Sequence, residues 1–197
     1  MPHGAFENTG LRSAVFGLAL DAFELAYTEA SLSESPIVTI IDYELPSRMK
    51  RLWVIDLETK RLLYNDYVTH GRGSDRNHDG VMDSASNEDS SYKSNVGLLT
   101  TGETYTGKHG KSLRVDGQEP GFNDNARDRN IVFHSASYAD DSFVDTHGKT
   151  GRSHGCPALD PDVSGEIIDT IKDGKLVFAY WPDKDWLEQS RFLNPSG

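Results

Sequence analysis

Short runs of β-branched and aromatic residues recur along this chain, and no other feature of the sequence constrains its fold as strongly. Two of these runs, at 51–57 and 61–67, flank the turn Glu58-Thr59-Lys60 and predict a β-hairpin. Further strands are predicted at 37–41, 96–101, 112–115, 131–134 and 175–180. Together these segments predict a mainly β domain of the α+β class, with helices at its periphery.

The longest predicted helix precedes the first strand. From Ser13 to about Leu32, apolar residues recur near the helical period among few charges, which predicts a helix packed on the domain. Pro36 ends this helical pattern. We therefore divide the chain into an N-terminal helical segment, residues 1–35, and a domain over residues 36–197.

A second helix is predicted at 162–172, because Asp160 is a good cap and Pro161 suits the first helical position. Asp173-Gly174 would close this helix, and a last helical turn is predicted at 185–192.

Composition bounds the possible partners. The 197-residue chain has a formal charge of −11 and no stripe of lysine and arginine, which argues against nucleic acid and disfavours anionic membrane surfaces. No run of about 18 apolar residues predicts a membrane-spanning helix, and Met1-Pro2-His3-Gly4 lacks the regions of a signal peptide. The hydrophobic share of 36% suffices for one core, and the sequence specifies no oligomeric state.

The single cysteine, Cys156, lies in the segment Gly151-Arg152-Ser153-His154-Gly155-Cys156-Pro157. The glycines let the backbone turn so that amides can face a reacting group, and the arginine and histidine favour an ionised sulfur. One cysteine excludes an internal disulfide and a multi-thiolate metal site. A covalent catalyst, an inert buried thiol, and a mixed metal ligand with His154 and His134 remain open.

An acylating cysteine needs a base, and His134 is the preferred candidate. It ends the apolar segment that begins at Asn130, so a rigid strand would hold it. A core histidine bound to a backbone carbonyl is the structural alternative. His147 competes for the same role, but the polar stretch 145–149 around it predicts a mobile loop.

These residues resemble a known family when they are taken with their neighbours. His134-Ser135, followed after a loop by Ser153-His154-Gly155-Cys156, is similar to the signature of the L,D-transpeptidases that crosslink bacterial peptidoglycan. The similarity extends through 105–114 and 121–127 and covers about residues 36–181. Pro157-Ala158-Leu159 after the cysteine resembles the murein L,D-transpeptidase subgroup.

The resemblance implies a mixed β-sheet fold with peripheral helices and an enzyme that needs no cofactor for catalysis. It implies Cys156 as the nucleophile, His134 as its base, and the backbone carbonyl of Ser135 as the group that orients the imidazole. The amides of Gly155 and Cys156 would bind the oxyanion, with His154 nearby.

Four further residues are assigned to the substrate cleft by the same resemblance: Arg152, Ser153, Tyr105 and His109. Ala158 departs from the widespread family pattern, which has an arginine there, and Arg152 is the candidate to supply that charge instead. Without the resemblance, each of the three has an equally good structural explanation. Arg152 could be a solvated loop charge, Tyr105 a packed strand aromatic, and His109 a loop histidine with no function.

The implied reaction is acyl transfer from a stem tetrapeptide, with release of D-alanine and formation of a diaminopimelate–diaminopimelate crosslink. Peptidoglycan stem peptides would be the partners, and the protein would act outside the cytoplasmic membrane. Three alternatives stay open: an L,D-carboxypeptidase or hydrolase on the same stems, a general cysteine peptidase, and a non-catalytic wall-associated module stabilised by calcium.

The family does not account for the acidic loop at 75–83. Its oxygen-bearing residues alternate before a glycine and resemble the first nine positions of an EF-hand loop. The predicted ligands of a structural calcium ion are Asp75, Asn77, Asp79, the carbonyl of Val81, and Asp83. Ser86 stands at the twelfth position, where an acidic residue is expected, and Glu88 or Asp89 could replace it only if the backbone bulges. A solvated acidic loop is the alternative.

Overall fold

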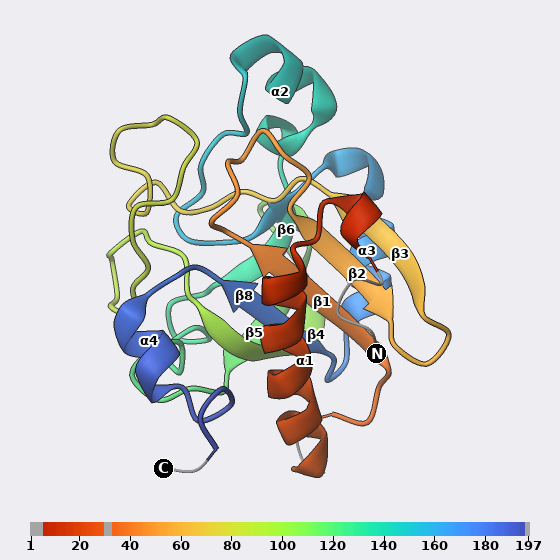
Figure 1. The fold of residues 1–197 in the computed structure, drawn as a ribbon. Helices are drawn as coiled ribbons and strands as arrows, with labels where there is room; N and C mark the ends of the chain where they lie inside the picture. Colours follow the sequence, from red (N-terminus) through yellow and green to blue (C-terminus); the bar gives the residue numbers. More distant parts are fainter. Residues whose placement is uncertain (1–5, 30–32, 196–197) are drawn as a thin grey trace.

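A single mixed β-sheet forms the centre of the protein, as the computed structural model shows for residues 6–29 and 33–195 (Figure 1). The strands are β1 (Ile37–Asp42), β2 (Leu52–Asp56), β3 (Arg61–Asp66), β4 (Gly97–Gly107), β5 (Gly110–Gly117), β6 (Val132–Ser135), β7 (Ala158–Leu159) and β8 (Leu176–Tyr180). Their order across the sheet is β3-β2-β1-β8-β4-β5-β6-β7. The β1–β8 and β6–β7 pairs are parallel and the other neighbours antiparallel, so the predicted α+β class with a mixed sheet is confirmed.

The helices lie around this sheet. They are α1 (Ser13–Thr28), α2 (Asp141–His147), α3 (Pro161–Ile171) and α4 (Lys184–Gln189), with short 3-10 turns at Glu7–Thr9 and Ser137–Ala139. In Figure 1, α1 crosses in front of the sheet and α3 lies behind it, whereas α2 projects beyond the sheet at the top. No described helix is long and apolar enough to cross a membrane.

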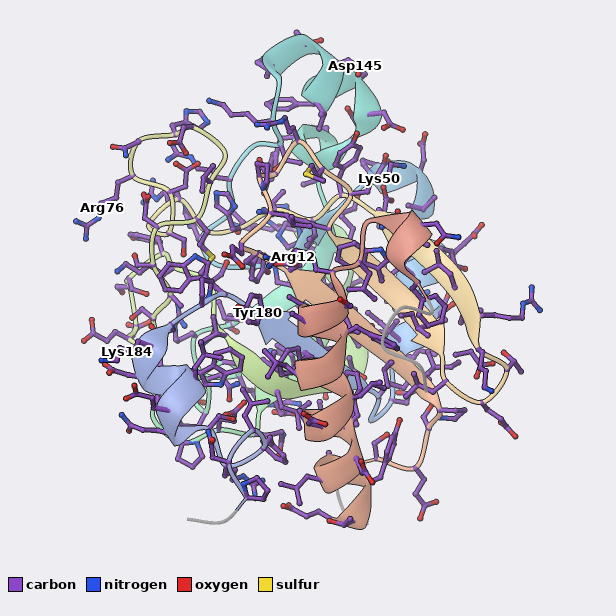
Figure 2. The ribbon with its side chains drawn as sticks, in the orientation of Figure 1. Arg12, Lys50, Arg76, Asp145, Tyr180 and Lys184 are labelled. Carbon is purple, nitrogen blue, oxygen red and sulfur yellow. The ribbon has the colours of Figure 1, made fainter. Side chains whose placement is uncertain are left out.

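Helix α1 is part of the same hydrophobic core as the sheet. Its apolar face buries Val15, Phe16 and Phe23, and the Phe23 ring meets the ring of Phe178 on β8 edge-on at 6.3 Å. Just before the helix, the Arg12 guanidinium lies 5.6 Å from the centre of the Tyr180 ring (Figure 2). The helix thus packs on the sheet within one core. Its predicted end near Leu32 falls in residues 30–32, outside the described residues.

The predicted N-terminal cap of α3 forms, whereas the helix ends at Ile171 with Lys172 as its C-cap, before the predicted closure at Asp173-Gly174. Asp160 accepts a hydrogen bond from the Asp162 amide at 2.8 Å, and Pro161 is the first residue of α3. Strand β4 runs further than predicted, from Gly97 to Gly107, because its threonine-rich second half pairs with β5 instead of ending with the apolar run.

One prediction about local structure was wrong. His147 does not lie in an irregular loop: it ends α2, whose cap Asp140 accepts a hydrogen bond from the Phe143 amide at 2.6 Å. Gly148 closes the helix in the left-handed conformation, with φ 70°. Because α2 has only one buried residue, Val144, the sequence has no apolar stripe that would reveal it.

Candidate active site

A cleft of about 530 Å³ opens at the end of the sheet that contains β6 and β7. The β4–β5 hairpin tip, the end of β6 and the turn before β7 all contribute to it. The lining residues are Tyr105, Gly107, Lys108, His109, Ser112, Arg129, Asn130, Val132, His134, Tyr138, Arg152, Ser153, His154 and Cys156. Segments that are far apart in the sequence thus bring the predicted nucleophile and the predicted base into one cleft.

The turn before Cys156 requires glycine at position 155. Gly155 has φ 121°, and a β-carbon there would lie 2.7 Å from the Lys93 carbonyl oxygen and 2.9 Å from Ile131 Cδ1. The side chain of Ser153 fixes the same turn, because its hydroxyl donates to the Cys156 carbonyl at 2.6 Å and accepts from the Gly155 amide at 3.0 Å. The backbone around the sulfur is therefore rigidly positioned.

The thiol of Cys156 is only partly accessible. It donates a weak hydrogen bond to the Asn130 carbonyl oxygen at 3.6 Å. Burial raises the pKa of Cys156 above its ordinary value, although a backbone hydrogen bond from Val132 and the charges of Arg129 and Lys108 oppose this effect. The sulfur is thus protonated at neutral pH, and it needs a base to become a nucleophile.

His134 has the properties of that base. The side chain is 3% exposed, and its Nδ1 lies 2.9 Å from the Ser135 carbonyl oxygen, the contact that the family resemblance implies. Burial lowers the pKa of His134, and the nearby His109 and Lys108 lower it further, against the Ser135 hydrogen bond. A neutral imidazole that donates from Nδ1 keeps the lone pair of Nε2 free to accept a proton.

Strand pairing holds His134 beside the cysteine turn. His134 on β6 pairs with Ala158 on β7, two residues after Cys156, and with Ser112 on β5. The ring of His109, from the hairpin tip, stacks on the His134 ring with a centre-to-centre distance of 4.4 Å and an interplanar angle of 21°. This stacking restricts the rotation of the imidazole.

The remaining predicted cleft residues have mixed roles. Tyr105 lines the cleft while the Arg114 guanidinium lies 4.6 Å from the centre of its ring. Arg152 lines it too, but also donates to the Asp75 carbonyl oxygen. His154 is exposed and packs against Tyr92, with ring centres 4.7 Å apart.

The two predicted oxyanion donors, the amides of Gly155 and Cys156, differ in whether they already have a hydrogen-bond acceptor. The Gly155 amide is bonded to Ser153 Oγ, so this donor has a partner already. The Cys156 amide has no hydrogen-bond acceptor among residues 6–29 and 33–195. The Cys156 amide is therefore the better placed of the two to receive a developing oxyanion.

Sequence reasoning missed seven lining residues: Gly107, Lys108, Ser112, Arg129, Asn130, Val132 and Tyr138. Arg129 is the most extensively bonded of them, because its two terminal nitrogens donate to Ser86 O, Asn95 Oδ1, Ser91 Oγ and Lys93 O at 2.7–3.1 Å. It thereby fastens the loop between β3 and β4 to the cleft. The available signal was position alone: Arg129 and Asn130 directly precede the strand that carries His134.

A buried polar network, also missed, connects the core to the cysteine turn. Arg51 and His70 are both 0% exposed, and Arg51 donates to His70 Nδ1 at 2.7 Å. Burial and the Arg51 charge lower the pKa of His70, so the neutral ring keeps its proton on Nε2 and donates it to Asp75 at 3.2 Å. The His70 backbone carbonyl in turn accepts from the Ser153 amide at 3.0 Å.

This network occupies the first of the predicted calcium ligands. Besides His70, the Asp75 carboxylate accepts from the amides of Asp79 and Gly80, both at 3.1 Å. Asp79 accepts from the Val81 amide and Asp83 from the Arg76 amide, while the Arg76 side chain extends from the loop into solvent (Figure 2). Asn77 is exposed. Within the described parts of the chain, no three His, Cys, Asp or Glu side chains are arranged to hold a metal ion.

Calcium binding by this loop stays a prediction, and we expect it to be weak. A Kd on the order of 10⁻⁴–10⁻³ M is expected, because Asp75 is held inward by His70 and no acidic residue stands at position 86. Calorimetric titration with calcium measures this affinity, and an Asp79→Asn/Asp83→Asn double variant is the control. Submicromolar binding would contradict the expectation and require the loop to rearrange.

Comparisons with known proteins concern the domain as a whole. A family model of the L,D-transpeptidase catalytic domain matches residues 7–180. No curated protein matches the chain. Among solved structures, an L,D-transpeptidase from Mycobacterium smegmatis has a TM-score of 0.46 and 14% identity, covering 75% of this chain and 59% of its own. L,D-transpeptidase 3 from Mycobacterium tuberculosis, in complex with a faropenem-derived adduct, has a TM-score of 0.47 and 12% identity, with 74% and 60% covered.

The chain spans about 60% of the length of these solved proteins. Both TM-scores are below 0.5, so the match to the family model is the stronger of the two findings.

Proposed function

Because the chain belongs to the family of L,D-transpeptidase catalytic domains, we propose that it transfers acyl groups between peptidoglycan stem peptides through Cys156. The observation that carries this proposal is the shared cleft of Cys156 and His134, in which the Ser135 carbonyl orients the imidazole. A thiol with a raised pKa in the same cleft as a neutral histidine is suited to general-base activation.

In the proposed reaction, Nε2 of His134 takes the proton of Cys156 as the sulfur attacks the carbonyl that precedes the terminal D-alanine. The Cys156 amide stabilises the negative oxygen of the tetrahedral intermediate. Collapse of the intermediate forms a thioester, and the departing amine of D-alanine takes the proton from the imidazolium. The thiol, the base and the leaving group thus exchange one proton with no cofactor.

The second substrate determines the product. A side-chain amine of diaminopimelate from another stem gives a crosslink, whereas water gives an L,D-carboxypeptidase. A non-catalytic wall module is the less favoured alternative, since both Cys156 and His134 are in place. Peptidoglycan lies outside the cytoplasmic membrane, so the proposed function places the working protein there.

Purified muropeptides incubated with the protein and analysed by mass spectrometry test the proposal. We expect crosslinked dimers together with free D-alanine. Shortened monomers without dimers would favour the carboxypeptidase, and unchanged muropeptides would contradict both enzymatic functions. A casein digest checks that the activity is not that of a general cysteine peptidase.

A further inference from the structure

A second, smaller hollow adjoins the cleft that contains Cys156. Its volume is about 170 Å³, and it is lined by Asp89, Ser90, Tyr92, Arg129 and His154. Arg129 and His154 line both hollows, and His154 is two residues from Cys156. A ligand in the second hollow would therefore adjoin the main cleft, across Arg129 and His154, without occupying it.

The two hollows differ in charge. The lining of the main cleft contains three cationic residues, Lys108, Arg129 and Arg152, and no aspartate or glutamate. This is unusual for a chain with a net charge of −11, and it suits a donor peptide that carries free carboxylates. The second hollow contains one carboxylate, Asp89.

Asp89 is available to bind a ligand. It is exposed and forms no ion pair within 4.0 Å among the described residues, where its side chain accepts a hydrogen bond from the Ser90 hydroxyl at 3.1 Å. Arg129 borders the same hollow, but its terminal nitrogens donate to groups of the β3–β4 loop and not to Asp89. The Arg129 charge nonetheless limits the affinity that a cation can reach here.

The wall around Asp89 is held in shape by packing. Ser90 and Tyr92 both have φ 55°, in the left-handed region that such residues rarely adopt. Arg129 bonds Ser91 between them, and the Tyr92 ring packs against His154 on one side and the Arg72 guanidinium, 4.1 Å from its centre, on another. The segment that carries Asp89 is therefore held against Arg129 and His154, which also line the main cleft.

We propose that the hollow lined by Asp89, Tyr92 and His154 binds the primary ammonium group of the acceptor stem, with Asp89 as its specificity-determining residue. This inference rests on the proposed function, because an acceptor is needed only after Cys156 has been acylated. It assigns the donor to the cationic cleft and the acceptor to the hollow with the carboxylate.

The second half-reaction conserves atoms and charge. The acceptor ammonium releases one proton to solvent and its nitrogen attacks the thioester carbonyl, forming the new C–N bond. His134 takes a second proton from that nitrogen, the C–S bond breaks, and the sulfur of Cys156 receives the proton from His134. Asp89 supplies only attraction and orientation for the incoming ammonium, so it has no part in the first half-reaction.

Binding is measured first, without turnover. A stem tripeptide with a free diaminopimelate amine is titrated into the Cys156→Ala protein by calorimetry. We expect Asp89→Asn in this background to weaken binding about three- to five-fold, the range of an exposed ion pair, and Asp89→Glu to restore it. Glu88→Gln is the matched control, because Glu88 is a neighbouring exposed carboxylate outside the lining of the hollow. A tripeptide with its side-chain amine acetylated should bind equally well with and without the Asp89→Asn substitution.

Partition between products is measured second, in the protein with Cys156 intact. Asp89→Asn should lower the ratio of crosslinked dimer to hydrolysed tripeptide about three- to five-fold. Its rate of acylation by a carbapenem should stay unchanged. Unchanged tripeptide affinity and an unchanged product ratio would overturn the acceptor site while leaving the proposed function intact. Absence of acylation in the unsubstituted protein would overturn the proposed function itself, whatever the binding results.

Discussion

Cys156→Ala is expected to abolish covalent labelling by a carbapenem, measured as the mass shift of the intact protein. The chain contains no second cysteine that could replace the lost nucleophile. The rest of the cleft should be unaffected, because the backbone of the turn is held by Ser153 and Gly155 and not by the sulfur. The variant should therefore fold with an unchanged circular dichroism spectrum and a similar Tm.

Labelling of Cys156→Ala at the rate of the unsubstituted protein would exclude Cys156 as the nucleophile. A serine at the same position provides the matched comparison. Cys156→Ser keeps the size of the side chain but raises the pKa of the nucleophile far above that of a thiol, so we expect at most slow labelling.

His134→Ala is expected to slow acylation about 10²- to 10⁴-fold near neutral pH, the usual contribution of a positioned general base. The effect should be large because burial raises the pKa of Cys156 above its ordinary value of 9.0, which leaves little thiolate without a base. His147→Ala is the matched control: His147 lies on α2, outside the cleft lining, and this variant should acylate normally.

The pH dependence of the acylation rate should differ between the unsubstituted protein and His134→Ala. Burial lowers the pKa of His134 below its ordinary value of 6.5, so the unsubstituted protein should lose activity only as the pH falls through that lowered value. Without the base, the rate depends on thiolate formed by hydroxide and should rise with pH toward the raised pKa of Cys156. The difference in acylation rate between the unsubstituted protein and His134→Ala should therefore become smaller at high pH. A constant gap across this range would contradict the role of His134 as a base.

All strands except the two-residue β7 were predictable, because their β-branched and aromatic residues are consecutive. Inner strands such as β1, β2 and β8 are almost wholly buried, which favours that composition. Asp160 and Pro161 predicted the start of α3 through capping chemistry that depends on neighbouring residues alone. Helix α2 was not predictable in this way, since its single buried residue gives no periodic signal. The extension of β4 depends on pairing with β5, which a local pattern does not encode.

The candidate site was likewise predictable only in part. Cys156 and His134 could be selected from residue type and flanking glycine, and the fold brings them into one cleft. The bonds of Arg129 to the β3–β4 loop could not be predicted, because each joins residues more than thirty positions apart. The buried pair of Arg51 and His70 could not be predicted either, since neither residue belongs to a sequence motif.

Strand β8 separates β1–β3 from β4–β7 in the sheet, and it is the last strand along the chain. During synthesis, strands β1–β3 therefore cannot pair into one sheet with β4–β7 until residues 176–180, which form β8, have been made. Until then, β1 and β4 each present an unpaired backbone edge, which invites association with other chains. A nascent polypeptide that stops short of Leu176 should accordingly be insoluble even though every residue of the cleft has been made.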